Sequence, residues 1–162
     1  WTVTLPALGP AVASAAAEAG AVVFLGCLRN ATAVARAVLA EQNRRAARTS
    51  VNVIAAGELS GQGDAAVLRF SVEDQLGAGA VFGALEALGL DHSSPEAAAA
   101  SESFRGLRSA VRHLLTASGS GQELLETDRR AEVLAAAAHD ADDAVPVLRD
   151  GVWRAYEAIS AE

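Results

Sequence analysis

The chain has 162 residues, of which 51% are apolar, so it can form one ordinary domain with a buried core. Its 20 acidic and 13 basic residues give a formal charge of −7, which disfavours nucleic-acid binding, because that function needs a basic excess. The single cysteine, Cys27, excludes a disulfide scaffold, and no run of about 20 apolar residues is available to cross a bilayer. No signal-peptide pattern is present. We therefore expect a cytoplasmic protein with a single domain over residues 1–162.

The start of the chain is unusual, since it begins at Trp1 and the sequence contains no methionine. Removal of an initiator methionine normally leaves a small residue first, so we expect the chain to be the C-terminal two thirds of a longer protein. Alternating apolar and polar residues predict a short strand at 1–5. The alanine-rich stretch 11–18 predicts a helix that ends at Gly20.

Two apolar runs follow, residues 21–27 and 51–55, with the length and composition of strands that are buried on both faces. Between them, residues 31–47 predict a helix with Asn30 as its N-cap. Residues 57–66 are rich in glycine and polar side chains and are expected to form a loop.

Helices dominate the second half. Residues 72–89 predict a helix capped by Ser71, and its three internal glycines indicate that another element packs very close to it. Further elements are expected as helices over 96–117, from 122 and over 128–138, a strand at 144–148, and a turn or short helix at 151–158. Apolar strands that alternate with helices predict an α/β fold around a mostly parallel sheet.

A first candidate site follows the strand predicted at 21–27, because ligands of parallel α/β sheets gather at the carboxyl ends of the strands. Arg29 and the start of the helix after Asn30 could hold an anion, since unpaired N–H groups and the helix dipole both favour negative charge. The alternative is a structural N-cap beside a solvated arginine.

A second candidate site follows the other apolar run, where Gly57 and Glu58 precede Arg69 and the pair Glu73 and Asp74. With Glu58, the two adjacent carboxylates form a cluster that suits a hard cation such as Mg²⁺, which takes oxygen ligands and keeps several waters. The alternative is the ordinary enrichment of acidic residues in a first helical turn.

The sequence lacks the motifs of several other kinds of catalytic or binding site. A P-loop is excluded because the chain has no lysine, and the histidines have no zinc-ligand spacing. Cys27 lacks the arginine six residues later that a thiol-phosphatase loop needs. The acidic run 140–143 beside His139 is interpreted as a solvated helix end. A stripe of arginines is interpreted as a solvated face or as part of a homo-oligomer interface: Arg105, Arg108 and Arg112.

Several segments together resemble the 2-phosphosulfolactate phosphatase (ComB-type) family. They are residues 26–35 (GCLRNATAVA), 53–58 (VIAAGE), 68–80 (LRFSVEDQLGAGA), 118–125 (SGSGQELL), and Asp140 together with 145–151 (VPVLRDG). The resemblance is collinear over nearly the whole chain, and the combination is far more specific than any one motif.

The resemblance implies a three-layer α/β/α fold and Mg²⁺-dependent hydrolysis of 2-phospho-3-sulfolactate, which gives sulfolactate and phosphate on a route to coenzyme M. The partner would then be a small anionic phosphate ester. By motif match, the expected catalytic residues are Glu73, Asp74 and Glu58, with Glu73 and Asp74 also at the metal, and the expected substrate-binding residues are Arg29, Asn30, Gly57 and Arg69.

Two departures from the family pattern support a second hypothesis. No Asp-x-x-Arg-Ala-Thr-type motif is present, and residues 7–11 (ALGPA) stand where the family has a Ser-Pro-Asn-Gly-Ser-like turn. This replacement removes hydrogen-bonding side chains, and Pro10 has no N–H. The chain could therefore be a phosphohydrolase, or a catalytically silent relative that serves as a small-anion-binding or assembly module.

Overall fold

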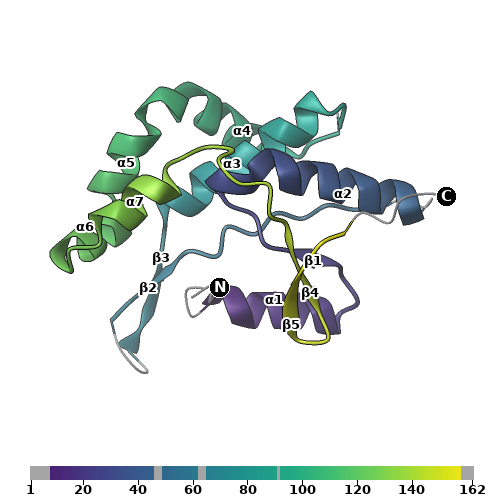
Figure 1. Ribbon diagram of the computed structural model, residues 1–162, viewed down its shortest axis with the longest axis horizontal. Coiled ribbons are helices and arrows are strands. Elements are labelled where there is room, and N and C mark those ends of the chain that lie inside the picture. The colour runs from purple at the N-terminus through teal and green to yellow at the C-terminus, as the bar shows by residue number, and fades with distance from the viewer. Residues whose placement is uncertain (1–7, 46–48, 62–64, 91, 158–162) are drawn as a thin grey trace.

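The computed structural model describes residues 8–45, 49–61, 65–90 and 92–157 (Figure 1). The strand expected at 1–5 lies outside these ranges. The helices are α1 (Leu8–Glu18), α2 (Ala31–Arg45), α3 (Val72–Ala87), α4 (Pro95–Leu107), α5 (Val111–Ala117), α6 (Gly119–Glu126) and α7 (Arg130–Ala136), with 3₁₀ turns η1 (Leu28–Asn30) and η3 (Arg108–Ala110). The strands are β1 (Val23–Phe24), β2 (Glu58–Ser60), β3 (Val67–Arg69), β4 (Pro146–Arg149) and β5 (Val152–Ala155).

The predicted helices are present, with small shifts at their ends. Helix α4 begins as expected, because the Ser94 hydroxyl accepts the Ala97 N–H and Pro95 occupies the first turn. The long helix predicted over 96–117 is interrupted by η3 and continues as α5. Helix α1 starts three residues earlier than predicted and includes Pro10 in its first turn, where the missing N–H has no cost.

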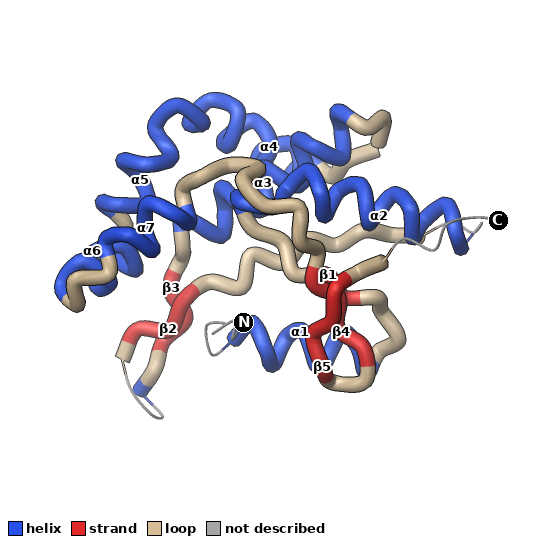
Figure 2. The backbone as a smooth tube through the Cα atoms, in the orientation of Figure 1, coloured by secondary structure: helices blue, strands red, loops and turns tan. Residues whose placement is uncertain are grey.

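The prediction of a mostly parallel sheet in a three-layer α/β/α fold is wrong. The described residues form one three-stranded sheet in the order β1-β4-β5 and one hairpin of β2 with β3, and all these pairs are antiparallel. Figure 2 shows how little of the chain is strand compared with helix. Of the C-terminal residues 151–158, expected as a turn or short helix, Gly151 lies in a turn and 152–155 form β5, which pairs with β4.

The two apolar runs explain this error. Within the first run, Val23 and Phe24 pair with β4, and the Leu25 N–H donates to the Pro146 carbonyl. The second run is extended but belongs to neither sheet: Val51 and Val53 pack against the helical core, whereas Ile54 is 59% exposed. A short apolar run has the same periodicity whether it joins a sheet or lies against helices, so the sequence pattern could not separate the two.

The core lies between α2, α3 and α4 and extends to α5 and α7 (Figure 1). The crossing of α3 with α4 depends on Gly79, because a Cβ there would lie 2.8 Å from the Cβ of Phe104 and against the Ala100 carbonyl. This confirms that an element packs closely on the glycine-rich helix. Helix α1 lies across the β1-β4-β5 sheet, away from the other helices. The hairpin of β2 with β3 projects away from the helices, and Arg69 at the end of β3 contacts α6.

The core is built mainly from small and medium-sized aliphatic side chains. Its buried members are Leu28, Ala31, Val34, Ala35, Leu76, Ala80, Val81, Leu85, Phe104, Val111, Leu115 and Val133. None of the helices within the described ranges is long and apolar enough to span a membrane.

Candidate functional site

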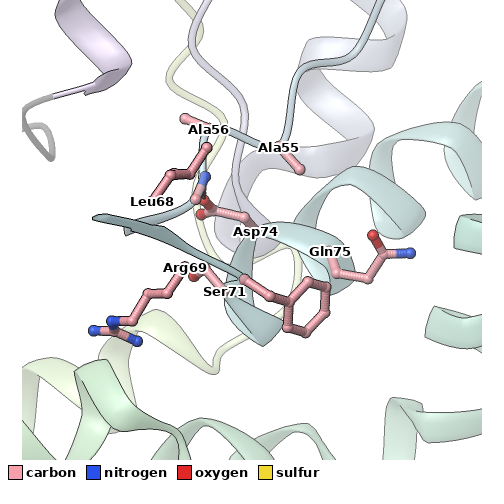
Figure 3. Close-up of a pocket in the computed structure, with 9 residues that line it drawn as sticks. Ala55, Ala56, Leu68, Arg69, Ser71, Asp74 and Gln75 are labelled. Atoms are coloured by element: carbon pink, nitrogen blue, oxygen red, sulfur yellow. Dashed lines mark hydrogen bonds between the residues drawn. The ribbon is translucent and has the colours of Figure 1, made fainter. Parts of the chain in front are cut away.

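A hollow of about 320 Å³ lies between the start of α3 and the base of the hairpin of β2 with β3. Its lining comes from three segments: Ala55, Ala56 and Gly57 before β2; Leu68, Arg69, Phe70 and Ser71 after the hairpin turn; and Asp74 and Gln75 on α3. Figure 3 shows the Asp74 side chain reaching from α3 toward the segment at Ala56. Three of the residues predicted for the second candidate site therefore share one hollow: Gly57, Arg69 and Asp74.

Asp74 is bound to the backbone across this hollow. Its Oδ2 accepts the N–H of Gly57 at 2.7 Å. Burial raises the pKa of Asp74, the Gly57 N–H opposes this rise, and the charges of Glu73 and Glu58 add to it. The carboxylate therefore lies in a region of negative potential with one backbone donor.

The neighbouring carboxylates differ in their surroundings. The Oε2 of Glu73 is buried and has no hydrogen-bond partner within the described part of the chain. Glu58 lies at the start of β2, opposite Arg69 in the hairpin register, and lines a second hollow of about 340 Å³. The same second hollow is lined by Ser120 and Glu123 of α6.

Arg69 connects the two hollows. It lines the first, while its Nη2 donates to Ser120 Oγ and pairs with Glu123 Oε1, both at 3.2 Å. A Cβ on Gly119 would lie 2.8 Å from Arg69 Nη1, so the guanidinium lies directly on the N-terminal turn of α6. Ser120 and Glu123 were not predicted as site residues, although both belong to the SGSGQELL segment that carries the family resemblance.

Arg29 and Asn30 do not line the hollow beside Asp74. Arg29 donates to the Ala135 carbonyl at 2.8 Å and lies 3.9 Å from a carboxylate oxygen of Asp142. Asn30 is buried; its Oδ1 accepts the Cys27 N–H, and its Nδ2 donates to the carbonyls of Leu25 and Ala144.

The N-terminus of α2 is occupied by a carboxylate of the chain itself. Asn30 is not its N-cap, because that residue belongs to η1. Asp140 accepts the N–H of Thr32 at 2.9 Å and the hydroxyl of Thr32 at 2.7 Å. Burial raises the pKa of Asp140, but the two hydrogen bonds from Thr32, together with the charges of His139 and Arg108, outweigh it, so the pKa is lowered. The acidic run at 140–143 thus supplies a capping residue, a role that the sequence reasoning missed because Asp140 is 108 residues from Thr32 along the chain.

The described residues hold no group of three or more His, Cys, Asp or Glu side chains placed to bind a metal. Mg²⁺ commonly uses one or two carboxylates together with waters and phosphate oxygens. Asp74 fits that requirement, because it lines the hollow and its charge is disfavoured by its neighbours. Glu73 precedes it in α3 with an unpartnered Oε2, but does not line the hollow. Glu73 and Asp74 are therefore the residues that could hold such a cation.

A family model described as 2-phosphosulpholactate phosphatase matches residues 8–151. No curated protein and no solved structure matches the chain. Because the family match covers most of its length, the chain belongs to the 2-phosphosulpholactate phosphatase family, as the sequence motifs predicted.

Proposed function

We propose that the chain is a Mg²⁺-dependent phosphatase that hydrolyses 2-phospho-3-sulfolactate, or a related small anionic phosphate ester, to the alcohol and phosphate. The family is one of phosphatases. The observation that carries the proposal is the hollow at the start of α3 in which the Asp74 carboxylate faces the Gly57 amide. Glu73, whose Oε2 has no partner among the described residues, precedes Asp74 in α3 and does not line this hollow.

The chemistry of the substrate explains the choice of residues. Such a substrate carries phosphate, sulfonate and carboxylate groups, so binding it requires positive charge and N–H donors. In the proposed site, Glu73 and Asp74 hold Mg²⁺, which when bound polarises the phosphoryl group and activates water. Arg69 and the Gly57 N–H bind and orient the anionic groups, and Glu58 adds a third carboxylate near them.

Arg29 and Asn30 have a smaller part in this proposal. The side chain of Asn30 is fully engaged with the backbone and holds η1 in place. Arg29 is one-third exposed and lines neither hollow, so its part as a substrate contact is supported by the motif match alone. We therefore treat Arg29 as a secondary substrate contact and Asn30 as a residue that positions it.

One observation favours the second hypothesis, a catalytically silent module. The main-chain donors that could bind an anion already have carboxylate acceptors in the chain itself: Gly57 has Asp74, and Thr32 at the start of α2 has Asp140. A silent relative would keep both contacts and release no phosphate.

Phosphate release from 2-phospho-3-sulfolactate and from simple phosphate esters, measured with Mg²⁺ and with EDTA, separates the two hypotheses. In this assay Glu73→Gln should reduce Mg²⁺-dependent turnover at least about a hundredfold, because it removes a charged ligand. Its melting temperature should stay close to that of the parent.

Glu96→Gln is the matched control, since Glu96 occupies in α4 the same second position that Glu73 occupies in α3. It should leave turnover unchanged. Absence of Mg²⁺-dependent phosphate release from the parent protein would refute the enzymatic proposal. A melting temperature that falls much further in Glu73→Gln than in Glu96→Gln would show that Glu73 serves to stabilise the helix.

A further inference from the structure

The Gly57 N–H donates to Asp74 Oδ2. In the proposed function this same N–H binds an anionic group of the substrate, so the Asp74 carboxylate occupies the position that the substrate would take. Both residues line the hollow at the start of α3. The inference drawn from this bond rests on the proposed function and concerns how cation and substrate binding depend on each other.

The Gly57 amide is held in a fixed direction. Gly57 is buried and has φ +73°, in the left-handed region that favours glycine. A Cβ there would lie 2.8 Å from Leu68 Cδ1 and 2.9 Å from the Arg69 carbonyl oxygen, so β3 fixes the backbone from one side. A backbone N–H that is oriented in advance on a pocket wall can bind an anionic oxygen without reorganisation.

Asp74, in contrast, is weakly compensated as the present acceptor. The Gly57 N–H is its one hydrogen bond to the described residues, and no ion pair joins it to them. The nearest arginine on the pocket wall, Arg69, is engaged with Ser120 and Glu123 on α6. Glu73 and Glu58 add negative potential at the Asp74 carboxylate. A cation would stabilise this carboxylate more than a single N–H does.

We propose that Asp74 exchanges partners: on binding the divalent cation its carboxylate leaves the Gly57 N–H, and this N–H then donates to an anionic oxygen of the substrate. The Gly57 amide is therefore covered in the cation-free protein. Cation and anion then raise each other's affinity by the same factor, as linkage requires.

Two substitutions at Asp74 separate this exchange from simple charge repulsion. Asp74→Asn and Asp74→Ala remove the same negative charge, but the Asn side-chain oxygen can still accept the Gly57 N–H, whereas Ala leaves it free. With EDTA present, calorimetric titration with inorganic phosphate should show about tenfold tighter binding to Asp74→Ala than to Asp74→Asn, as expected for one hydrogen bond to a charged group. Equal affinities of the two variants would overturn the proposal.

A measurement on the unsubstituted protein avoids any dependence on how the variants fold. In ¹⁵N-glycine-labelled protein, saturation with Mg²⁺ should move the Gly57 amide proton upfield as its short hydrogen bond is lost, and phosphate added next should move it back downfield. In Asp74→Asn, which keeps the bond and binds the cation poorly, Mg²⁺ should leave this resonance in place.

The outcomes distinguish this inference from the function on which it rests. Mg²⁺-dependent hydrolysis with a Gly57 resonance that does not respond to Mg²⁺ would overturn the partner exchange and leave the phosphatase proposal standing. If Mg²⁺ neither supports hydrolysis nor shifts the Gly57 amide resonance, both the partner exchange and the phosphatase proposal are overturned.

Discussion

At the scale of single residues, the carboxylate of Asp74 contributes unfavourably to folding at neutral pH. Burial, together with Glu73 and Glu58, raises its pKa, and the Gly57 N–H only partly compensates. A folded-state pKa above the unfolded one means that the folded protein binds more protons between the two values. Stability is therefore lost as pH rises through that window and remains lower above it.

We accordingly predict that Asp74→Asn raises the melting temperature at pH 7 in EDTA by a few degrees, because the amide keeps the bond to Gly57 and removes the desolvated charge. Differential scanning calorimetry would measure the shift. The control is Asp143→Asn, an exposed position, which should change the melting temperature little. A lower melting temperature for Asp74→Asn would show that the ionised carboxylate stabilises the fold.

At the scale of elements, the packing of α3 on α4 depends on one glycine. We predict that Gly79→Ala lowers the free energy of unfolding by about 2–3 kcal/mol, because the new methyl group would press on the Ala100 carbonyl and on Phe104. Urea unfolding would measure the loss.

Gly83→Ala, in the same helix, provides the matched comparison. Its added methyl would make an ordinary contact with Ser101 Oγ at 3.4 Å, and alanine is the better helix former. It should leave stability unchanged or raise it by up to about 1 kcal/mol. Equal losses in the two variants would contradict the prediction, because the cost would then not be specific to the close crossing at Gly79.

Within α2, a buried carboxylate gives the fold a defined acid sensitivity. The side chain of Glu41 is 9% exposed and accepts hydrogen bonds from Arg44 and Arg45. The bond from Arg44 is the largest of the influences that lower its pKa to about 2, and burial opposes them. Because the folded pKa is depressed, the stabilisation is complete above the unfolded value of about 4.5 and is lost as pH falls toward 2.

We predict that Glu41→Gln removes about 1–2 kcal/mol of stability at pH 7, since both arginines are partly solvated and their attraction is screened. The difference from the parent should disappear near pH 2. Chemical unfolding at a series of pH values would measure it, and a difference that is constant with pH would contradict the assignment to the ion pairs.

At the scale of the whole molecule, Asn30 joins segments that are far apart in the chain. Its side chain binds the backbone at Leu25 and Cys27 and reaches Ala144, 114 residues away. We predict that Asn30→Ala lowers the free energy of unfolding by about 2–4 kcal/mol, because buried backbone groups lose their partners. Urea unfolding would measure it. Asn52→Ala, at an exposed position, should cost less than about 0.5 kcal/mol, and a similar cost for both would refute this role of Asn30.

Several large apolar side chains near the candidate site are exposed to solvent. Ile54, Val67, Leu68 and Phe70 are each more than half exposed, and they lie in the extended segment and hairpin around the candidate site. An isolated two-stranded hairpin has little stability by itself, so the contacts of Arg69 with α6 help to hold its base.

The sequence predicted much at the level of local structure and composition. Helix positions followed from local sequence patterns, and the glycines of the helix over 72–89 indicated a close crossing before its partner was known. Collinear motifs predicted the family, which the family match confirms. These features depend on residues close together in the chain, so their signals are visible in the sequence.

The pairing of distant segments was decided by the tertiary structure. The run at 51–55 has strand composition, yet it packs against helices and joins no sheet among the described residues, which removes the basis for a parallel sheet. Likewise, only the folded chain brings Asp140 to the start of α2 and Asp74 to Gly57. Strand pairing and the surroundings of a carboxylate depend on which segments are in contact in the folded chain. Contacts between segments that are far apart in the sequence leave no short sequence pattern, so they could not be predicted from it.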